Sequence, residues 1–325
     1  MNKLITKLMV IMAAALLLPA VPSGAAETVR VLLPWLPQSQ FAGVYMAQKQ
    51  GFYTERGIDV RISHADSKTI GVNELKKGKY DFILCWCLSG LMAAGNGDDI
   101  VNICQVVNRS NCILVTRKHS GINTLEDLKG KRLSTWINAD AGYPVKLALA
   151  SNGINMKLYD QNTTNSLFLI GGVDVCTCLT YNEYNNLYYS GLDYSDMKIF
   201  TLAEMGVDLP EDAIFCTHKT LETRRAQCRA FVTGTLLGWE YAESHRDEAL
   251  KEVMNRTNEA HLRCSPAHMK YMLDAILPSI FSRDHKWKTG TLSRRQFNNC
   301  VYLMDKNGFI KRKPTYAEFY KGMGL

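Results

Sequence analysis

The chain has 325 residues, of which 46% are hydrophobic and 21% charged, so it is long enough for one or two globular domains with a sizeable core. Its formal net charge is +7, but the basic residues are spread along the chain and form no stripe interleaved with stacking rings. This distribution argues against nucleic-acid binding.

The N-terminal segment has the composition of a cleavable secretory signal peptide. Two lysines form a basic start, residues 8–18 form an apolar core too short to span a bilayer, and residues 23–26 are small residues suited to cleavage. The first cysteine of the chain is Cys85, so no lipid-attachment cysteine follows the leader. We therefore expect residues 1–26 to be removed and the mature protein to be exported to the periplasm.

A strand, a loop, a helix, a tight turn and a second strand are predicted over residues 29–62. Pro34 ends the first strand because proline cannot donate to a ladder, and Gly51 ends the helix over 42–50. Parallel strands of this kind place ligand sites on the loops after their carboxyl ends. The candidate ligand-binding residues in the first such loop are Trp35, Gln38, Gln40 and Phe41.

This opening resembles that of the periplasmic solute-binding proteins of ABC importers, in particular the binders of sulfonates, nitrate and thiamine-pyrimidine precursors. The matching residues are Trp35, Pro37, Gln40-Phe41-Ala42-Gly43, Ala47, Gly51-Phe52-Tyr53 and Gly57-Ile58-Asp59-Val60. A second string, residues 124–133, resembles the segment that opens the second lobe of such proteins. The resemblance covers the whole mature chain. It implies a type II periplasmic-binding-protein fold, an α/β fold with two lobes, a hinge and a ligand cleft.

The rest of the first lobe is predicted to continue the α/β alternation. Its elements are a helix at 67–77, a strand at 82–87, a helix at 88–94 and a strand at 100–107. Trp86 and Ser89 lie where the strand at 82–87 turns into a helix, and both are candidate ligand-binding residues. A simple strand-to-helix turn is the alternative reading of this position.

The second lobe is predicted to contain two further loops that face the cleft. Its strands are expected at 112–116, 133–136, 158–162, 173–179 and 198–202, with helices at 143–152 and 167–171. The candidate ligand-binding residues after these strands are Asn138, Asp140, Tyr143, Tyr181, Asn182 and Glu183. In the family, the position of Glu183 holds an acidic or polar side chain that contacts the ligand, whereas its alternative role is that of a partner for the helix dipole.

A crossover strand at 213–218 is expected to return the chain to the first lobe. The helices expected after it span 221–244, 246–256, 266–277 and 293–307. The predicted boundaries are 27–112 for the first lobe, 113–213 for the second, and 214–325 for the return strand and C-terminal helices.

The first of three candidate functions is capture of a small solute for import. Five rings could form flat apolar walls, with core packing as the alternative for each: Trp35, Phe41, Trp86, Tyr143 and Tyr181. The resemblance implies delivery to an ABC permease with its ATPase, by a protein that we expect to be monomeric. No arginine stands at the strand ends to hold a sulfonate or phosphate. We therefore expect a neutral or cationic planar ligand, such as a thiamine pyrimidine precursor or a related heterocycle.

The second candidate is an enzyme of the same fold. Fungal thiamine pyrimidine synthases resemble these binders but need a lysine, a sacrificial histidine, pyridoxal phosphate and a cysteine-rich iron site. In this sequence the lysine position falls on Cys85 and the histidine position on Ser89, and the cysteine string retains only Cys216. Covalent catalysis through a Schiff base is impossible without its amine. We therefore expect no enzyme activity and no cofactor.

The third candidate is a soft-metal site built from the ten cysteines. Cys85 and Cys87, like Cys176 and Cys178, are two residues apart, a spacing that places side chains on one face of a strand. If the two pairs met across the cleft, four thiolates would suit Zn or Cu(I). The alternative is that each cysteine is a small buried hydrophobe. The sequence leaves the redox state of the cysteines open.

Overall fold

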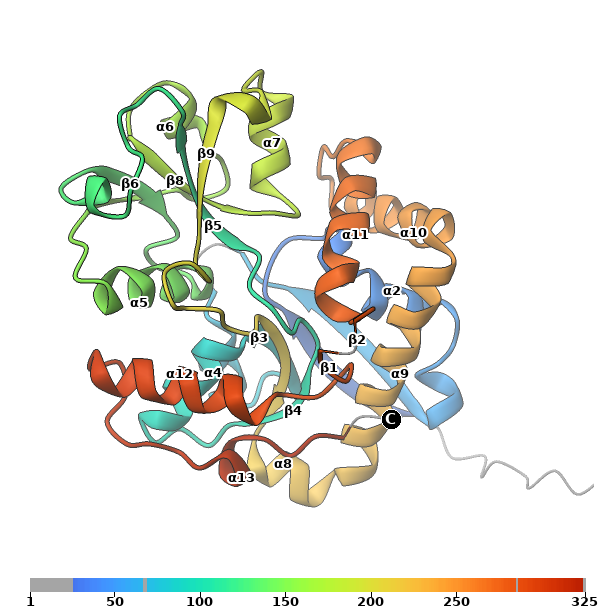
Figure 1. The fold of residues 1–325 in the computed structure, drawn as a ribbon. Coiled ribbons are helices and arrows are strands. Elements are labelled where there is room, and N and C mark those ends of the chain that lie inside the picture. Colours follow the sequence, from blue (N-terminus) through green and yellow to red (C-terminus); the bar gives the residue numbers. More distant parts are fainter. Residues whose placement is uncertain (1–25, 67–68, 285, 324–325) are drawn as a thin grey trace, which may run out of the picture.

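The computed structural model describes residues 26–66, 69–284 and 286–323, and it contains two five-stranded sheets with helices packed around them (Figure 1). All but the last residue of the predicted signal peptide, 1–26, lies outside the described residues. No helix within the described residues is both long enough and apolar enough to cross a bilayer.

The first sheet has the strand order β2-β1-β3-β10-β4. Its strands are β1 (Glu27–Leu33), β2 (Ile58–His64), β3 (Phe82–Trp86), β4 (Val101–Gln105) and β10 (Asp212–Cys216). β1 pairs in parallel with β2 and β3, whereas β10 lies antiparallel between β3 and β4. A strand from late in the chain therefore lies between two strands of a sheet that begins at the N-terminus.

The second sheet has the same arrangement, in the order β7-β6-β8-β5-β9. Its strands are β5 (Cys112–Arg117), β6 (Arg132–Thr135), β7 (Lys157–Asp160), β8 (Val175–Leu179) and β9 (Met197–Thr201). β5 is antiparallel to β8 and β9, while β6 is parallel to β7 and β8. The two mixed sheets agree with the prediction of two α/β lobes.

The chain crosses between the sheets twice, over 106–111 and over 202–211, and Glu211 joins the two crossings. Its buried carboxylate accepts hydrogen bonds from the backbone N–H of Asn111 and, at 2.9 Å, from the Asn111 side chain. Ser279 donates to the amide oxygen of Asn111 at 2.9 Å. The hinge is thus a buried polar network rather than two free strands.

The helices between strands follow the predicted order, and the larger ones after β10 cover the first lobe. Up to β10 they are α2 (Ala42–Lys49), α3 (Gly71–Lys76), α4 (Cys87–Gly95), α5 (Tyr143–Ser151), α6 (Ser166–Leu169) and α7 (Glu183–Tyr189). After β10 they are α8 (His218–Thr223), α9 (Arg225–Ser244), α10 (Arg246–Glu259), α11 (Pro266–Ile280), α12 (Arg294–Lys306) and α13 (Tyr316–Phe319). Short 3-10 turns at Ser39–Phe41 and Asp140–Gly142 precede α2 and α5.

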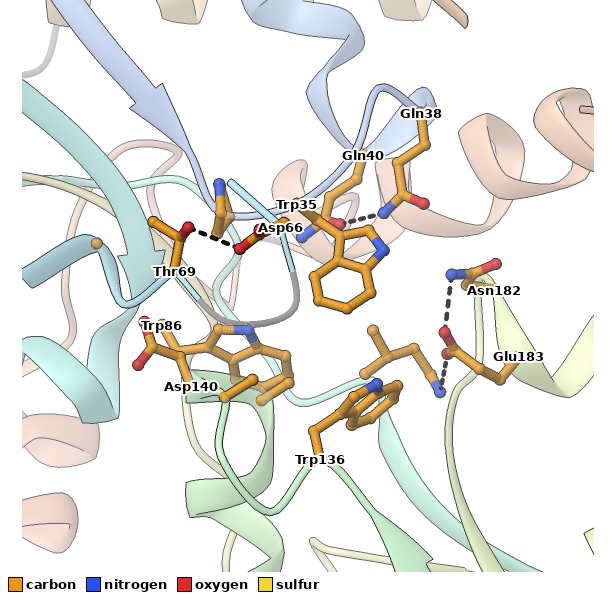
Figure 2. Close-up of a pocket in the computed structure, with 15 residues that line it drawn as sticks. Trp35, Gln38, Gln40, Asp66, Thr69, Trp86, Trp136, Asp140, Asn182 and Glu183 are labelled. Atoms are coloured by element: carbon orange, nitrogen blue, oxygen red, sulfur yellow. Dashed lines mark hydrogen bonds between the residues drawn. The ribbon is translucent and has the colours of Figure 1, made fainter. Parts of the chain in front are cut away.

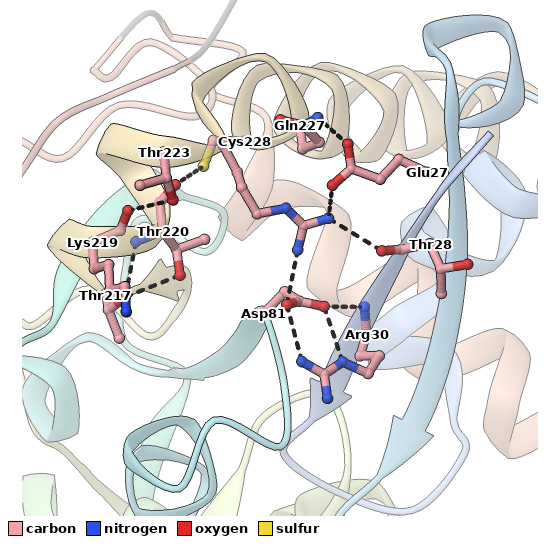
Figure 3. Close-up of polar contacts among 11 residues, drawn as sticks. Glu27, Thr28, Arg30, Asp81, Thr217, Lys219, Thr220, Thr223, Gln227 and Cys228 are labelled. Carbon is pink, nitrogen blue, oxygen red and sulfur yellow. Dashed lines mark hydrogen bonds and ion pairs between the residues drawn. The ribbon is translucent and has the colours of Figure 1, made fainter. Parts of the chain in front are cut away.

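The single helix predicted over 221–244 is wrong, because the structure breaks it at Arg224. That residue leaves the helical conformation, with φ −130° and ψ 41°. Its guanidinium bonds Glu27 and contacts Asp81 at 2.9 Å, and Arg30 also donates to Asp81 (Figure 3). The break therefore lets one side chain fasten the start of α9 to β1 and to the turn before β3.

Two glycines allow α2 and α9 to pack almost backbone to backbone. A Cβ added at Gly43 would lie 2.3 Å from Cγ of Trp239, and one added at Gly238 would lie 2.0 Å from the carbonyl oxygen of Gly43. No side chain fits at such distances, so glycine is required at both positions. Since α2 begins directly after the loop containing Trp35, this packing also fixes that loop.

Candidate functional site

A pocket lies between the two lobes, at the ends of strands from both sheets. β1 is followed by Trp35, β3 ends at Trp86, and β6 is followed by Trp136; all three line the pocket. Leu179, Asn182 and Glu183, at and after the end of β8, form a further wall. The loops expected to face a cleft therefore do converge, as the strand-end rule predicts.

Three indoles are the aromatic residues of the pocket lining (Figure 2). Trp35 is half-buried, and Trp86 and Trp136 are only 4% and 5% exposed. Trp136 donates its indole N–H to the carbonyl of Asn162 at 2.8 Å, which holds the ring in place. Sequence reasoning missed Trp136 as a pocket residue, although its place at the end of a strand, like that of Trp35 and Trp86, was an available signal.

The charged groups that line the pocket are all carboxyls. They belong to Asp66, Asp140 and Glu183, and no Lys or Arg occurs among the described lining residues. Thr69 donates to Asp66 at 2.7 Å. Sequence reasoning identified Asp140 and Glu183 but missed Asp66 and Thr69. This lining favours ligands that carry hydrogen-bond donors or positive charge, because carboxylates only accept.

Asp140 has one carboxyl oxygen, Oδ1, without a hydrogen-bond partner among the described residues. Burial raises the pKa of this side chain to about 6. A buried acceptor without a partner carries a desolvation cost that a bound donor would remove. Asp140 is therefore poised to accept a hydrogen bond from a ligand.

Glu183, by contrast, is held on both oxygens. It accepts from the backbone N–H of Leu179 at 3.0 Å and from the Asn182 side chain at 2.9 Å (Figure 2). Burial raises its pKa to about 7. These contacts fix the direction of the carboxyl group, so that it presents a defined acceptor to the pocket.

The two predicted glutamines form a chain that ends on a buried acid. Gln38 donates to Gln40 at 2.6 Å, and Gln40 donates to Asp212 at 2.6 Å. Burial raises the pKa of Asp212 to about 6, and its Oδ1 atom has no partner among the described residues. Asp212, the first residue of β10, was not predicted as part of the site.

The remaining predicted residues lie outside this pocket. Phe41 and Tyr181 are buried in the core, where Phe41 packs against Tyr45. Ser89 and Tyr143 line an adjoining cavity that shares Asp140 with the pocket. Asn138 is exposed and lines neither. A ligand-binding role for these five residues stays a prediction, although core packing accounts for the two buried rings.

The two cysteine pairs belong to different hydrophobic clusters. Cys85 and Cys87 are buried in the main core, and Cys87 already belongs to α4 rather than to the strand. Cys176 and Cys178 lie in a separate cluster of the second lobe, with their sulfurs 3.7 Å apart. Within the described residues, no group of three or more His, Cys, Asp and Glu side chains is arranged to hold a metal ion.

Comparison with known proteins identifies the family. A family model described as "NMT1/THI5 like" matches residues 38–249, well over half of the chain. The chain belongs to the NMT1/THI5-like family. A Haemophilus influenzae protein whose name assigns it to thiamine biosynthesis is 22% identical over 309 residues, covering 93% of this chain and 94% of that protein. The formylaminopyrimidine-binding protein of Halalkalibacterium halodurans is 22% identical over 248 residues, covering 73% of each chain.

Other relatives of this NMT1/THI5-like chain are enzymes, but the similarity is partial. The 4-amino-5-hydroxymethyl-2-methylpyrimidine phosphate synthase of Schizosaccharomyces pombe is 28% identical over 109 residues, or 34% of this chain and 32% of that protein.

Solved structures confirm the fold. The alkanesulfonate-binding protein of Xanthomonas axonopodis superposes with a TM-score of 0.68 at 15% identity, covering 92% of this chain and 100% of that one. The periplasmic aliphatic sulphonate binding protein of Escherichia coli gives 0.66 at 13% identity, covering 92% and 94%. The predicted periplasmic-binding-protein fold with two α/β lobes is therefore confirmed.

Proposed function

We propose that this protein is the substrate-binding component of an ABC importer, and that it captures a small planar nitrogen heterocycle in the periplasm. The ligand class is a thiamine pyrimidine precursor or a related aminopyrimidine. The observation that carries the proposal is the pocket lining, in which three indoles accompany three carboxyl groups and no Lys or Arg among the described lining residues.

The indoles support a flat ligand. Trp35 and Trp86 come from one lobe and Trp136 from the other, so a planar ring between the lobes would find aromatic faces on both sides. Aromatic side chains stack on flat rings with little loss of side-chain freedom. Closure of the two lobes around such a ring would be a hinge motion of the kind common in periplasmic binding proteins.

The carboxyls support a ligand that donates hydrogen bonds. An aminopyrimidine offers amino N–H groups and a basic ring nitrogen, and the orphan oxygen of Asp140 and the oriented carboxyl of Glu183 are suitable acceptors. A sulfonate or phosphate would instead need positively charged donors, and the described lining residues include no Lys or Arg. The names of the relatives involved in thiamine biosynthesis and formylaminopyrimidine binding support the same ligand class.

The synthase alternative lacks its chemical groups. Cys85 and Ser89 stand at the lysine and histidine positions, and both are buried. Burial raises the pKa of the Cys85 thiol, so that it stays protonated and cannot substitute for an amine nucleophile. We therefore propose a binding protein without catalytic activity or cofactor, which acts as a monomer with an ABC permease and its ATPase.

Calorimetric titration with a panel of small solutes tests the proposal. The panel contains 4-amino-5-hydroxymethyl-2-methylpyrimidine, formylaminopyrimidine, taurine, an alkanesulfonate and nitrate. We expect the two pyrimidines to bind, and the two sulfonates and nitrate to give no heat. Asp140→Asn should weaken pyrimidine binding, whereas Asp284→Asn, an exposed surface change away from the pocket, should not. Binding of a sulfonate or nitrate without binding of either pyrimidine would overturn the proposed ligand class.

A further inference from the structure

A histidine that the sequence did not single out connects the two lobes beside the pocket. His268 lies in the first turn of α11, which faces α7 of the second lobe (Figure 1). Its Nε2 atom is 2.9 Å from Oδ1 of Asn182, and its Nδ1 atom is 3.0 Å from Nδ2 of Asn185. Both ring nitrogens are therefore used in contacts that reach across the cleft.

The neighbouring hydrogen bonds fix the protonation state of the ring. Tyr194 donates to Oδ1 of Asn185 at 2.9 Å, so the amide NH₂ of Asn185 faces His268. Asn182 donates its own NH₂ to Glu183, so its amide oxygen faces His268. The ring must then accept at Nδ1 and donate from Nε2, which only the neutral imidazole can do.

His268 is thereby linked to the pocket through one residue. The Nε2–H group at 2.9 Å and the Asn186 side chain at 3.2 Å both donate to Oδ1 of Asn182. The Asn182 amide in turn donates to one oxygen of Glu183, which lines the pocket. We propose that His268 is a positioning residue, which orients the Glu183 carboxyl group for ligand binding only when the lobes are closed. Protonation of His268 breaks the hydrogen bonds that connect it to Glu183, and the lobes then open. The inference rests on the proposed function, because it gives the captured ligand a pH-dependent release.

The direction of the pH effect follows from the contacts. A proton on Nδ1 would face the donor group of Asn185, so the charged ring cannot keep both bonds. Burial lowers the pKa of His268 below its ordinary value of 6.5. A group with a depressed histidine pKa binds fewer protons in the closed state, so closure is favoured above about pH 6.5 and weakens as the pH falls through that value.

No charged group among the described residues around His268 is hydrogen-bonded to its ring, which bonds only Asn182 and Asn185. α7 contributes Glu183, behind Asn182, and Tyr189, whose ring centroid is 6.1 Å from the imidazole. Arg263 and Cys264 line the same opening of the cleft. On the far side of α11, Arg246 of α10 and Lys270 both pair with Asp274. Burial raises the pKa of Glu183, so its protonation at low pH favours the closed state, whereas protonation of His268 opposes it. The effect of the histidine is therefore measured as the difference between wild type and a His268 variant.

A second bond across the same interface supplies a matched control. The hydroxyl of Tyr271, also on α11, donates to the carbonyl of Thr180 in the second lobe at 2.9 Å. This bond joins the lobes but does not involve Asn182 or Glu183. The Tyr271 hydroxyl also contacts that of Tyr194, but the bond from Tyr194 to Asn185 does not need it. Tyr271→Phe therefore removes one link between the lobes and leaves the hydrogen bonds from His268 through Asn182 to Glu183 in place.

The test measures affinity for 4-amino-5-hydroxymethyl-2-methylpyrimidine between pH 5.5 and 7.5 in wild type, His268→Ala, His268→Gln and Tyr271→Phe. At pH 7.5 we expect His268→Ala to bind roughly tenfold more weakly than wild type, and this ratio to approach one at pH 5.5. His268→Gln, which can still donate to Asn182 but does not titrate, should lose less affinity and also lack the acid-dependent weakening. Tyr271→Phe should keep the wild-type pH dependence. A constant ratio of wild type to His268→Ala across this range would overturn the inference.

A measurement without ligand separates this inference from the proposed function. Small-angle scattering of the ligand-free protein should show wild type expanding between pH 7.5 and 5.5, and His268→Ala expanded and unchanged at both values. If wild type binds no pyrimidine but shows this difference, the ligand class is wrong and the link through His268 stands. If the two proteins scatter alike at both pH values, the link fails even where pyrimidine binding is observed.

Discussion

The side-chain amide of Gln40 donates a 2.6 Å hydrogen bond to the carboxylate of Asp212, a residue 172 positions later in the chain. Both side chains are buried. The bond fastens the loop after β1, which carries Trp35, to the strand that returns from the second lobe. One wall of the pocket and one of the two crossings are thus held by the same contact.

Replacing Gln40 with methionine should destabilise the protein by about 1–3 kcal/mol, because the change leaves the Asp212 carboxyl buried with no donor. Urea unfolding followed by circular dichroism measures this free energy. Gln50→Met provides the matched control, since the Gln50 amide bonds the partly exposed Glu248, and should cost under about 1 kcal/mol. An equal decrease in the free energy of unfolding in the two variants would show that the buried Gln40–Asp212 hydrogen bond stabilises the protein no more than the partly exposed one.

The ligand-free protein should become less stable as the pH rises from 6.5 to 8. Burial raises the pKa of Glu211 to about 8 and that of Glu183 to about 7, so the folded state keeps protons that the unfolded chain releases near 4.5. A raised carboxyl pKa contributes stability at low pH that is lost as the pH rises through the folded value. Burial lowers the pKa of His64 and His268, so their contribution to the slope falls mainly below pH 6.5.

Thermal unfolding at several pH values measures this slope, and Glu211→Gln identifies its main source. The variant should have a flatter dependence of Tm on pH than wild type, whatever its absolute stability. A wild-type Tm that increases between pH 6.5 and 8 would contradict the assignment of Glu211 and Glu183 as protonated buried groups.

Trp35→Ala should weaken pyrimidine binding by roughly tenfold while leaving the fold intact, because a half-buried ring that stacks on ligand contributes more to binding than to the core. Calorimetric titration measures the affinity and circular dichroism the fold. Trp287 is also half-buried but lies outside the pocket, so Trp287→Ala should leave the affinity unchanged. A wild-type affinity in Trp35→Ala would remove this ring from the site.

Gly43→Ala should destabilise the protein by about 1–3 kcal/mol, although the same change in an exposed helix normally stabilises by about 1 kcal/mol. The added Cβ would overlap the Trp239 ring at 2.3 Å. Gly71→Ala is the control, because its Cβ would meet nothing closer than 3.5 Å. Denaturant unfolding gives the free energy of unfolding of both variants. A Gly43→Ala variant more stable than wild type would show that α2 and α9 can move apart to accommodate the Cβ without loss of stability.

Four strands, β3, β4, β8 and β10, were the easiest to predict from the sequence because they are buried at every position. Short apolar runs such as those of β3 and β8 are buried at every position, and turn residues at their ends limited them to within about two residues of their observed bounds. The break between α8 and α9 could not be predicted in this way. The break at Arg224 depends on Glu27 and Asp81, which are distant in sequence. The residues around position 224 therefore contain no local pattern that indicates it.

The candidate site could be predicted only in outline for the same reason. Strand ends indicated the right loops, but the direction of each side chain depends on contacts made elsewhere in the fold. Phe41 turns into the core because Tyr45 and His64 pack against it. Asp212 enters the site region because β10 inserts between β3 and β4, an order that a linear sequence does not display.

The position of β10 between β3 and β4 also has a consequence for how the chain folds. β3 and β4 do not pair with each other, so an N-terminal fragment that stops before residue 212 leaves β4 without a partner strand in the first sheet. Sheets that depend on such distant pairings form slowly, because a long loop must close before they gain any contact. The first lobe should therefore mature only after the second has been made, and the binding pocket should be among the last parts of the protein to appear.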